Sequence, residues 1–212
     1  MLEKLPDVLG HALSEVRAGL DKTLFQAVDL RQRMGAITVA SLAFADHAPI
    51  PERYTADGAG LSPPLHWSGV PAQAASVLVV VEDADSPTPQ PLVHAIAHGL
   101  PVDESGALAE GAMGGGDAAA TVSMGRNSLM QAAWLPPDPP PGHGVHRYVF
   151  QVFALGPGEP LAAAPGRDAV RTLLSERALA SGYLIGTYTR PDGSIPNTRA
   201  NPGTLVMPDP EA

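Results

Sequence analysis

Apolar positions along the chain follow two spacings, and each predicts a different kind of element. Between residues 5 and 34, leucine and valine recur every three or four residues, which predicts an amphipathic helix despite Gly10 and Gly19. Beyond residue 36, short apolar runs are bounded by glycine and proline, a pattern typical of strands and turns. The pattern therefore predicts an N-terminal helix followed by a mainly β domain.

The apolar stripe of this helix needs a surface to cover it. Two alternatives remain open: the stripe packs against its own domain, or it forms the contact of a homodimer. Because the helix precedes the β-rich part of the chain, we expect the first thirty or so residues to be a removable accessory.

The β-rich part contains one helix among its strands. The run SVLVVVED, residues 76–83, has no polar alternation, which predicts a strand buried on both faces. Residues 92–100 and 146–155 are also predicted strands, and residues 183–190 return to strand. Residues 168–182 begin with an acidic residue, show helical spacing and close on glycine, so they predict a helix.

Composition narrows the class of protein. The 212 residues include 22 glycines and 23 prolines, well above the usual share of about 7% and 5%, so we expect many turns and stiff loops. The net charge of −9 disfavours nucleic acids and anionic membranes as partners. The absence of cysteine excludes disulfides and thiolate chemistry. We find no transmembrane segment or signal peptide, which predicts a cytoplasmic protein.

Polar side chains that suit a binding site lie at the ends of predicted strands. His146 and Tyr148 share one face of a strand that follows the stiff prolines 139–141. Asp83 and Asp85 form an acidic ledge after the most buried strand, and His94 opens the next one. Each group also has a plain structural alternative: a capped strand with a hydrogen-bonded core histidine, or a turn capped by aspartate.

Four motifs in order resemble the phosphatidylethanolamine-binding protein family, in particular its bacterial Raf kinase inhibitor-like branch. They are LSPPLHWSGVP at 61–71, DADSP at 83–87, His94 seven residues before a proline, and PPPGHGVHRYVFQVFAL at 139–155. LIGTY near residue 187 also fits. The resemblance covers roughly residues 37–191. It implies a domain at 36–191, flanked by an N-terminal helical extension at 1–35 and a C-terminal tail at 192–212.

The resemblance also implies a fold and a pocket. The family fold is an antiparallel β-sandwich with peripheral helices, and its pocket binds phosphate and phosphorylated head groups. The departures from the family pattern include Trp134, which replaces a tyrosine, and Asp138, which stands where glycine or cysteine is usual; Gly60, Ala95 and Gly99 depart as well. The ligand-binding residues implied for this chain are Asp83, Asp85, His94, Trp134, Asp138, Pro139, Pro140, His146 and Tyr148. A cis peptide bond between Ser86 and Pro87 is implied as well.

The charge of this implied pocket raises a question about its ligand. The motifs place no lysine or arginine there, so positive charge rests on His94 and His146, whose pKa values nearby carboxylates would raise. We therefore expect anion binding to be strongest in mildly acidic solution, and Asp138 to weaken it by repulsion. A ligand with its own hydrogen-bond donor or an amine would fit better.

Three functions follow from these residues. The first is a non-enzymatic protein that binds a small anionic or polar ligand without a cofactor, or that inhibits a kinase or protease as a protein partner. The second is an enzyme that uses the same histidines, acids and tyrosine for general acid–base isomerisation, cyclisation or hydrolysis. The third is a metal site built from His94, His146 and a carboxylate. The resemblance favours the first.

Overall fold

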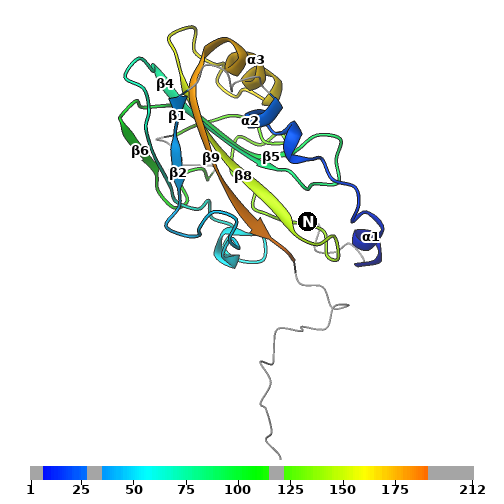
Figure 1. Ribbon diagram of the computed structural model, residues 1–212. Helices are drawn as coiled ribbons and strands as arrows, with labels where there is room; N and C mark the ends of the chain where they lie inside the picture. The colour runs from blue at the N-terminus through cyan, green and yellow to red at the C-terminus, as the bar shows by residue number, and fades with distance from the viewer. Residues whose placement is uncertain (1–6, 28–34, 115–121, 191–212) are drawn as a thin grey trace, which may run out of the picture.

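The computed structural model describes residues 7–27, 35–114 and 122–190. Two β-sheets dominate these residues, and Figure 1 shows the long strands β8 and β9 running side by side through the molecule. Helical segments are few and short, so the mainly β class predicted from the sequence is confirmed. The predicted C-terminal tail, residues 192–212, lies outside the described residues.

The larger sheet has six strands, and its centre is the apolar run recognised in the sequence. Its order is β1 (Gly35–Ala36), β9 (Ala178–Tyr188), β8 (His146–Leu155), β4 (Ser76–Asp83), β5 (Leu92–Leu100) and β7 (Ser123–Met124). All of β4 from Val77 onward is buried because β5 and β8 flank it and side chains cover both its faces.

The smaller sheet has three strands and packs against one face of the larger one. Its order is β2 (Thr38–Ala40), β3 (Leu65–Ser68) and β6 (Ser105–Leu108). Leu65 and Trp67 of this sheet share one hydrophobic cluster with Val79 and Phe150 of the larger sheet. The pairing is not wholly antiparallel as expected, because β1 enters alongside the last strand and runs parallel to β9.

The other face of the larger sheet carries helix α3 (Arg167–Arg177) and the N-terminal segment. The predicted helix over 168–182 is too long. Its last part, from Ala178, belongs to β9, because pairing with β8 outweighs the helical spacing there. Val170 and Leu174 anchor α3 in a second hydrophobic cluster against β4 and β8.

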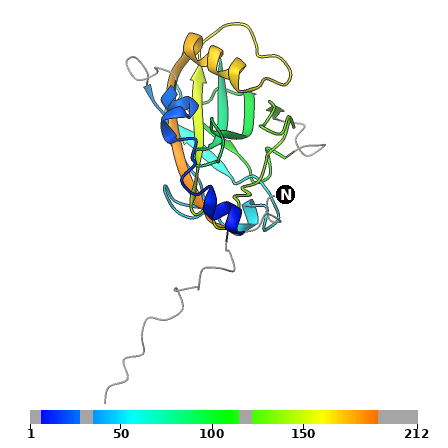
Figure 2. The same ribbon diagram turned by 90° about the vertical axis from the view of Figure 1, so that its right-hand side faces the viewer.

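The N-terminal segment is not the single amphipathic helix predicted from its spacing. It contains α1 (Asp7–Ala12), the 3-10 turn η2 (Leu20–Lys22) and α2 (Leu24–Ala27). Between α1 and η2 the chain is not helical, and Gly19 has a φ of 106°, a conformation that ends any helix. Figure 2 shows this segment lying along the sheet beside β9. We call residues 10–27 the arm.

The arm packs on its own domain. Leu24 is fully buried in the same cluster as α3, and the Leu24 amide donates to the Glu82 carboxylate at 2.7 Å. The Ala18 and Gly19 amides donate to carbonyl oxygens of residues 84 and 86. These contacts favour the first alternative for residues 10–27, whereas the homodimer remains a prediction.

Candidate functional site

A pocket of about 190 Å³ opens where β4 ends and where β5 and β8 begin. The strand ends supply its polar wall, and a proline-rich loop supplies the opposite wall. Its lining residues are Asp83, Ser86, Pro87, Leu92, His94, Leu129, Leu135, Pro136, Asp138, Pro139, Pro140 and His146. Four of these are prolines, which cannot donate a backbone hydrogen bond.

A chain of hydrogen bonds leaves the pocket from Asp83. His146 Nδ1 lies 2.7 Å from Asp83 Oδ2, and His146 Nε2 lies 2.7 Å from His143 Nδ1. His143 Nε2 then lies 2.8 Å from the carbonyl oxygen of Leu13 in the arm. Both ring nitrogens of His146 are therefore engaged within the protein. Asp83 also accepts the amide of residue 85 on its other oxygen, at 2.8 Å.

His94 presents one uncommitted nitrogen to the pocket. Its Nδ1 lies 2.6 Å from the Leu135 carbonyl, so Nδ1 carries the proton and Nε2 is left as an acceptor. Nε2 is buried and has no hydrogen-bond partner among the described residues. Burial lowers the pKa of His94 and outweighs the nearby charge of Asp83. The expectation that carboxylates raise the pKa of this histidine is therefore wrong, and His94 is neutral at pH 7.

Tyr148 and Trp134 lie behind the pocket wall and do not line it. The Tyr148 ring packs edge-on against His94 with ring centroids 5.1 Å apart, and the Trp134 ring lies tilted to His94 with centroids 6.1 Å apart. Both are buried, and burial raises the pKa of Tyr148 well above its usual value. Their aromatic rings hold His94 in place, a contribution to the pocket that does not require contact with a ligand.

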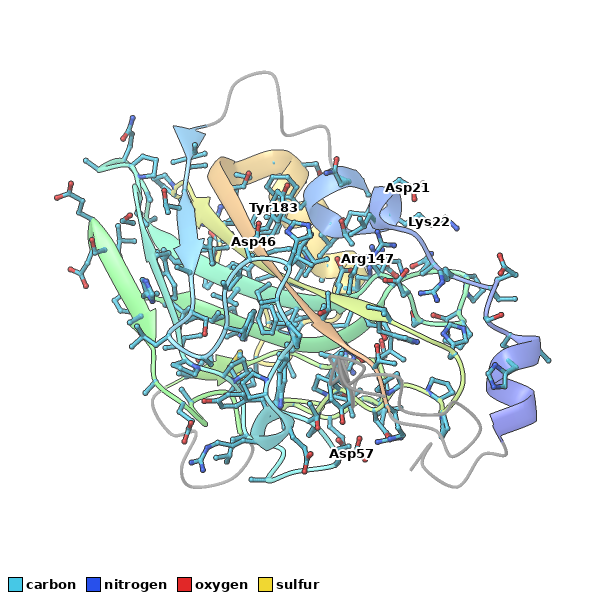
Figure 3. The ribbon with its side chains drawn as sticks, turned by 60° about the horizontal axis from the view of Figure 1, so that its bottom comes forward. Asp21, Lys22, Asp46, Asp57, Arg147 and Tyr183 are labelled. Carbon is cyan, nitrogen blue, oxygen red and sulfur yellow. The ribbon has the colours of Figure 1, made fainter. Side chains whose placement is uncertain are left out.

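Asp85 does not join Asp83 in the pocket. Its carboxylate accepts two hydrogen bonds from the Arg147 guanidinium, both at 2.7 Å, and Arg17 of the arm approaches to 3.1 Å. Burial alone would raise the pKa of Asp85, but the hydrogen bonds and charge of Arg147, with the help of Arg17, lower it. Figure 3 places Arg147 beneath the N-terminal segment. Strand alternation failed here because β4 ends at Asp83 and the chain then turns.

Asp138 lines the pocket but is not a bare negative charge. Arg190 forms an ion pair with it, with Nη1 2.5 Å from the Asp138 carboxylate, and also binds Asp57 and the Pro139 carbonyl. Figure 3 shows Asp57 at the lower edge of the molecule. Among the described residues no lysine or arginine lines the pocket, yet Arg190 compensates the carboxylate that was expected to repel an anion.

The turn after Asp83 has a trans peptide bond, so the predicted cis bond between Ser86 and Pro87 is wrong. Side-chain and backbone hydrogen bonds close the turn instead. The Leu92 amide donates to Ser86 Oγ at 3.2 Å, and the Thr88 amide donates to the Ser86 carbonyl at 2.8 Å. These bonds return the chain to β5 and bring His94 toward Asp83.

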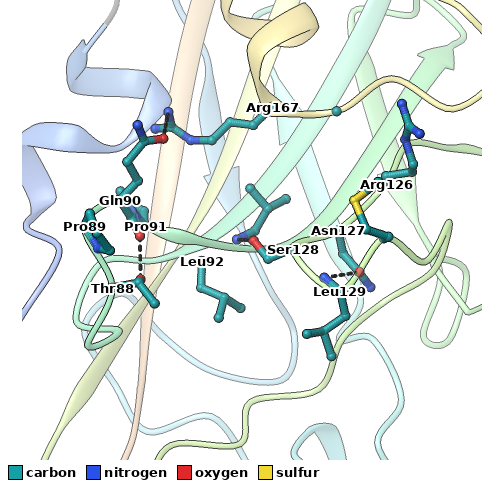
Figure 4. Close-up of a pocket in the computed structure, with 13 residues that line it drawn as sticks. Thr88, Pro89, Gln90, Pro91, Leu92, Arg126, Asn127, Ser128, Leu129 and Arg167 are labelled. Atoms are coloured by element: carbon teal, nitrogen blue, oxygen red, sulfur yellow. Dashed lines mark hydrogen bonds between the residues drawn. The ribbon is translucent and has the colours of Figure 1, made fainter.

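A larger and more open cavity, of about 580 Å³, adjoins the pocket and shares Leu92 and Leu129 with it. Figure 4 shows Arg126 and Arg167 at separate points around this cavity. Arg167 is committed, because it binds Glu82, Gln90 and a carbonyl of the arm. Arg126 is exposed and supplies a positive charge to the region next to the pocket.

Comparison with known proteins identifies the family. The family model described as phosphatidylethanolamine-binding protein matches residues 40–189. The chain belongs to this family. The match extends over the strands and loops that build the pocket.

Relatives in bacteria and archaea share most of this region. The UPF0098 protein Rv1910c of Mycobacterium tuberculosis is 41% identical over 152 residues, which is 72% of this chain and 70% of that protein. A UPF0098 protein of Methanothermobacter thermautotrophicus is 34% identical over 148 residues, which is 70% of this chain and 95% of that protein.

Two solved structures have a similar fold. The Chlamydia trachomatis phosphatidylethanolamine-binding protein homologue CT736 is 32% identical, with a TM-score of 0.64, over 73% of this chain and 98% of its own. Escherichia coli YbcL, described as a member of the mammalian family, is 25% identical, with a TM-score of 0.66, over 74% of this chain and 99% of its own.

Sequence reasoning missed two residues at the site. His143 lay within the quoted GHGVHRY segment, and its spacing of three residues from His146 was a usable signal in a turn. Arg190 gave no signal, since it is 52 residues from Asp138 and outside every motif. The described part of the chain contains no group of three or more histidine, aspartate or glutamate side chains that could hold a metal ion. In the same part of the chain, no helix is long and apolar enough to cross a bilayer.

Proposed function

We propose that the protein binds a small polar ligand in this pocket, and that the ligand brings its own hydrogen-bond donor. A phosphorylated head group with an amine belongs to this class. The observation that supports the proposal is His94 Nε2, a buried acceptor on the pocket wall without a partner among the described residues. A buried acceptor left unpaired costs about 1–3 kcal/mol, and a ligand donor would recover that free energy.

The remaining polar groups of the lining point to the same ligand chemistry. The side-chain donors of Ser86, His94 and His146 already have acceptors within the protein. The carboxylates of Asp83 and Asp138 offer further acceptor sites. The pocket therefore suits a ligand that donates, such as an ammonium group or a phosphate that has kept a proton.

Calorimetry with two matched head groups tests this proposal. The second pKa of a phosphate monoester is about 6, so at pH 8 phosphoethanolamine and phosphocholine both carry a doubly negative phosphate. Only phosphoethanolamine has N–H donors. We expect it to bind about tenfold more tightly, since a charge-assisted hydrogen bond contributes about 1.5–3 kcal/mol. Equal affinities would refute the donor requirement, and no binding of either compound would refute the proposed function.

Two matched variants of β5, at His94 and His98, test whether the ligand binds at His94. His94→Phe keeps a ring and removes the acceptor, so it should abolish the preference for phosphoethanolamine. His98→Phe changes a histidine four residues away, in a different cavity, and should leave the affinities unchanged. Loss of binding in both variants would point to a general disturbance of β5.

The enzyme alternative keeps one supporting observation. Neutral His94, whose buried Nε2 has no partner among the described residues, has the geometry of a general base, whereas both nitrogens of His146 are engaged within the protein. Incubation with phosphate esters, followed by phosphate release, tests this alternative. Regulation of a kinase or protease and a cytoplasmic location remain predictions from the sequence, as do the domain boundaries and the description of the fold as a sandwich.

A further inference from the structure

We propose that Asp83, His146 and His143 share three protons in one hydrogen-bonded chain. His143 is then a positioning residue for the pocket. The arm supplies the last acceptor of the chain, the Leu13 carbonyl. His143 touches no ligand in this proposal. It acts on the pocket by fixing the charge of His146. The effect on ligands rests on the proposed function, whereas the proton count does not.

The proton count follows from the chemistry of the two ends. Asp83 at one end and the Leu13 carbonyl at the other are acceptors, and three hydrogen bonds of 2.7, 2.7 and 2.8 Å connect them through the two rings. Three bonds need three protons, but two neutral imidazoles carry only two N–H groups. If the first proton moves onto Asp83, that bond reverses direction and the total is still three.

The surroundings place the additional proton on His146. The Asp83 carboxylate is in direct contact with His146 and favours a positive charge there. Beside His143, by contrast, the positively charged Arg17 guanidinium binds the His143 carbonyl at 3.0 Å. Burial, together with the charges of His146 and Arg17, lowers the pKa of His143. His94 of β5 and Asp138 line the same pocket as His146, and the Tyr148 ring of β8 stacks on His146 with ring centroids 6.4 Å apart. Neither His94 Nε2 nor the Tyr148 hydroxyl has a hydrogen-bond partner among the described residues.

His146 is therefore an imidazolium paired with the Asp83 carboxylate, and the pair has no net charge. His143 is neutral, accepts the His146 proton at Nδ1 and donates from Nε2 to the arm. If the Nδ1 acceptor is lost, His146 keeps only the proton that faces Asp83. The pocket wall then becomes more negative by one unit, without any change in a residue that lines it.

The arm packs against the loop that contains prolines 139–141 and His143. A Cβ added to Gly10 would lie 1.8 Å from the Pro141 carbonyl oxygen, so α1 packs directly against this loop. Arg17 donates to the carbonyls of His143 and Val145 at 3.0 and 2.7 Å. Displacing the arm would remove the Leu13 carbonyl, and with it the acceptor that holds the third proton.

Nitrogen-15 NMR of the histidine rings at pH 7 measures the proton count in the full chain without a ligand. We expect both nitrogens of His146 to be protonated, and Nε2 alone in His143. His143→Leu should leave His146 with one proton, whereas His143→Asn, whose carbonyl can accept at the Nδ1 position, should retain two. Two neutral rings in the wild type would overturn the proposal.

The affinities of inorganic phosphate and ethanolamine, two probes of opposite charge, then distinguish a positioning role of His143 from general structural damage. In His143→Leu, inorganic phosphate should bind about tenfold more weakly and ethanolamine about tenfold more tightly, because one positive charge has left the pocket wall. His143→Asn should restore both values. Gly10→Ala should shift both in the direction of His143→Leu by a smaller factor. Weaker binding of both probes would indicate structural damage and refute a positioning role, and unchanged values in Gly10→Ala would exclude the arm.

If neither probe binds the wild type, the proposed function is wrong while the NMR measurement still decides the proton count. Melting temperatures of the three variants show whether each folds. His143→Asn serves as the second variant if His143→Leu does not fold.

Discussion

Glu82 and Asp83 are neighbours at the end of β4, and both are buried, yet their side chains serve opposite faces of the larger sheet. Glu82 faces the arm and α3, and its oxygens accept from Arg167, Gln151 and the Leu24 amide at 2.7–2.8 Å. Asp83 faces the pocket, where its partner is a histidine.

The difference lies in what each carboxylate is paired with. Glu82 binds a guanidinium, which stays charged at any ordinary pH, so its contacts join the arm, α3 and the sheet permanently. Asp83 binds the ring of His146, and His94 Nε2, a buried acceptor with no partner among the described residues, lies on the same pocket wall. Similar burial therefore supports structure at Glu82 and, under the proposed function, ligand binding at Asp83.

The largest effect on stability should come from removing the ion pair between Glu82 and Arg167. Glu82→Gln leaves Arg167 without its buried partner, and loss of one member of a buried ion pair costs about 3–5 kcal/mol. Urea unfolding should show this decrease in the free energy of unfolding. Affinity for phosphoethanolamine, measured where the variant is folded, should stay within about twofold. A tenfold loss of affinity would contradict the separation of the two faces.

The arm belongs to the same face and can be tested at one residue. Leu24 is fully buried, so Leu24→Ala should lower the free energy of unfolding by about 2–5 kcal/mol. Val16→Ala, in the same segment but 47% exposed, is the matched control and should change stability by less than about 0.5 kcal/mol. Equal stabilities for Leu24→Ala and the wild type would support a removable arm, as the sequence first suggested.

Asp83→Asn tests the pocket side with the same kind of substitution. The amide can still accept from His146, so we expect a stability cost of about 1–3 kcal/mol, less than for Glu82→Gln. Phosphoethanolamine should bind about tenfold more weakly at pH 8, because a neutral amide accepts from an ammonium group less strongly than a carboxylate does. Calorimetry on both variants gives the comparison directly, and a larger loss of affinity in Glu82→Gln would reverse it.

The smallest effect is a dependence of stability on pH. Burial lowers the pKa of His94 and of His98 below the usual 6.5. Below that pH the unfolded chain takes up protons that the folded chain does not, so the free energy of unfolding should fall as the pH drops. Each residue contributes at most about 1.4 kcal/mol per pH unit, between 6.5 and its folded pKa.

Urea unfolding between pH 7 and pH 5 measures this slope. His98→Phe should reduce the slope without changing ligand affinity, whereas His94→Phe should change both. A slope that is the same in all three proteins would show that neither histidine is buried in its neutral form.

The amino-acid pattern alone predicted the mainly β class, the strands at residues 76–83, 92–100 and 146–155, and the family. These features depend on local patterns: an unbroken β-branched run, and motifs whose residues are close together in the chain. Asp83, His94, Asp138, Pro139, Pro140 and His146 were placed in one pocket by motif alone, and all six line the cavity.

The partner of each polar group became known only from the folded structure. Asp85 turns to Arg147 and Arg17, Arg190 reaches Asp138, and His143 joins His146 to the arm. Arg190 and Leu13 are far from their partners in the chain, and no local periodicity or motif spacing predicts contacts over such distances. The apolar stripe of the arm wrongly predicted a single helix. Periodicity shows which side chains are apolar, but it does not show which surface they cover. Charge and burial at the site depend on those long-range contacts, so the protonation of the pocket became readable only once the chain was folded.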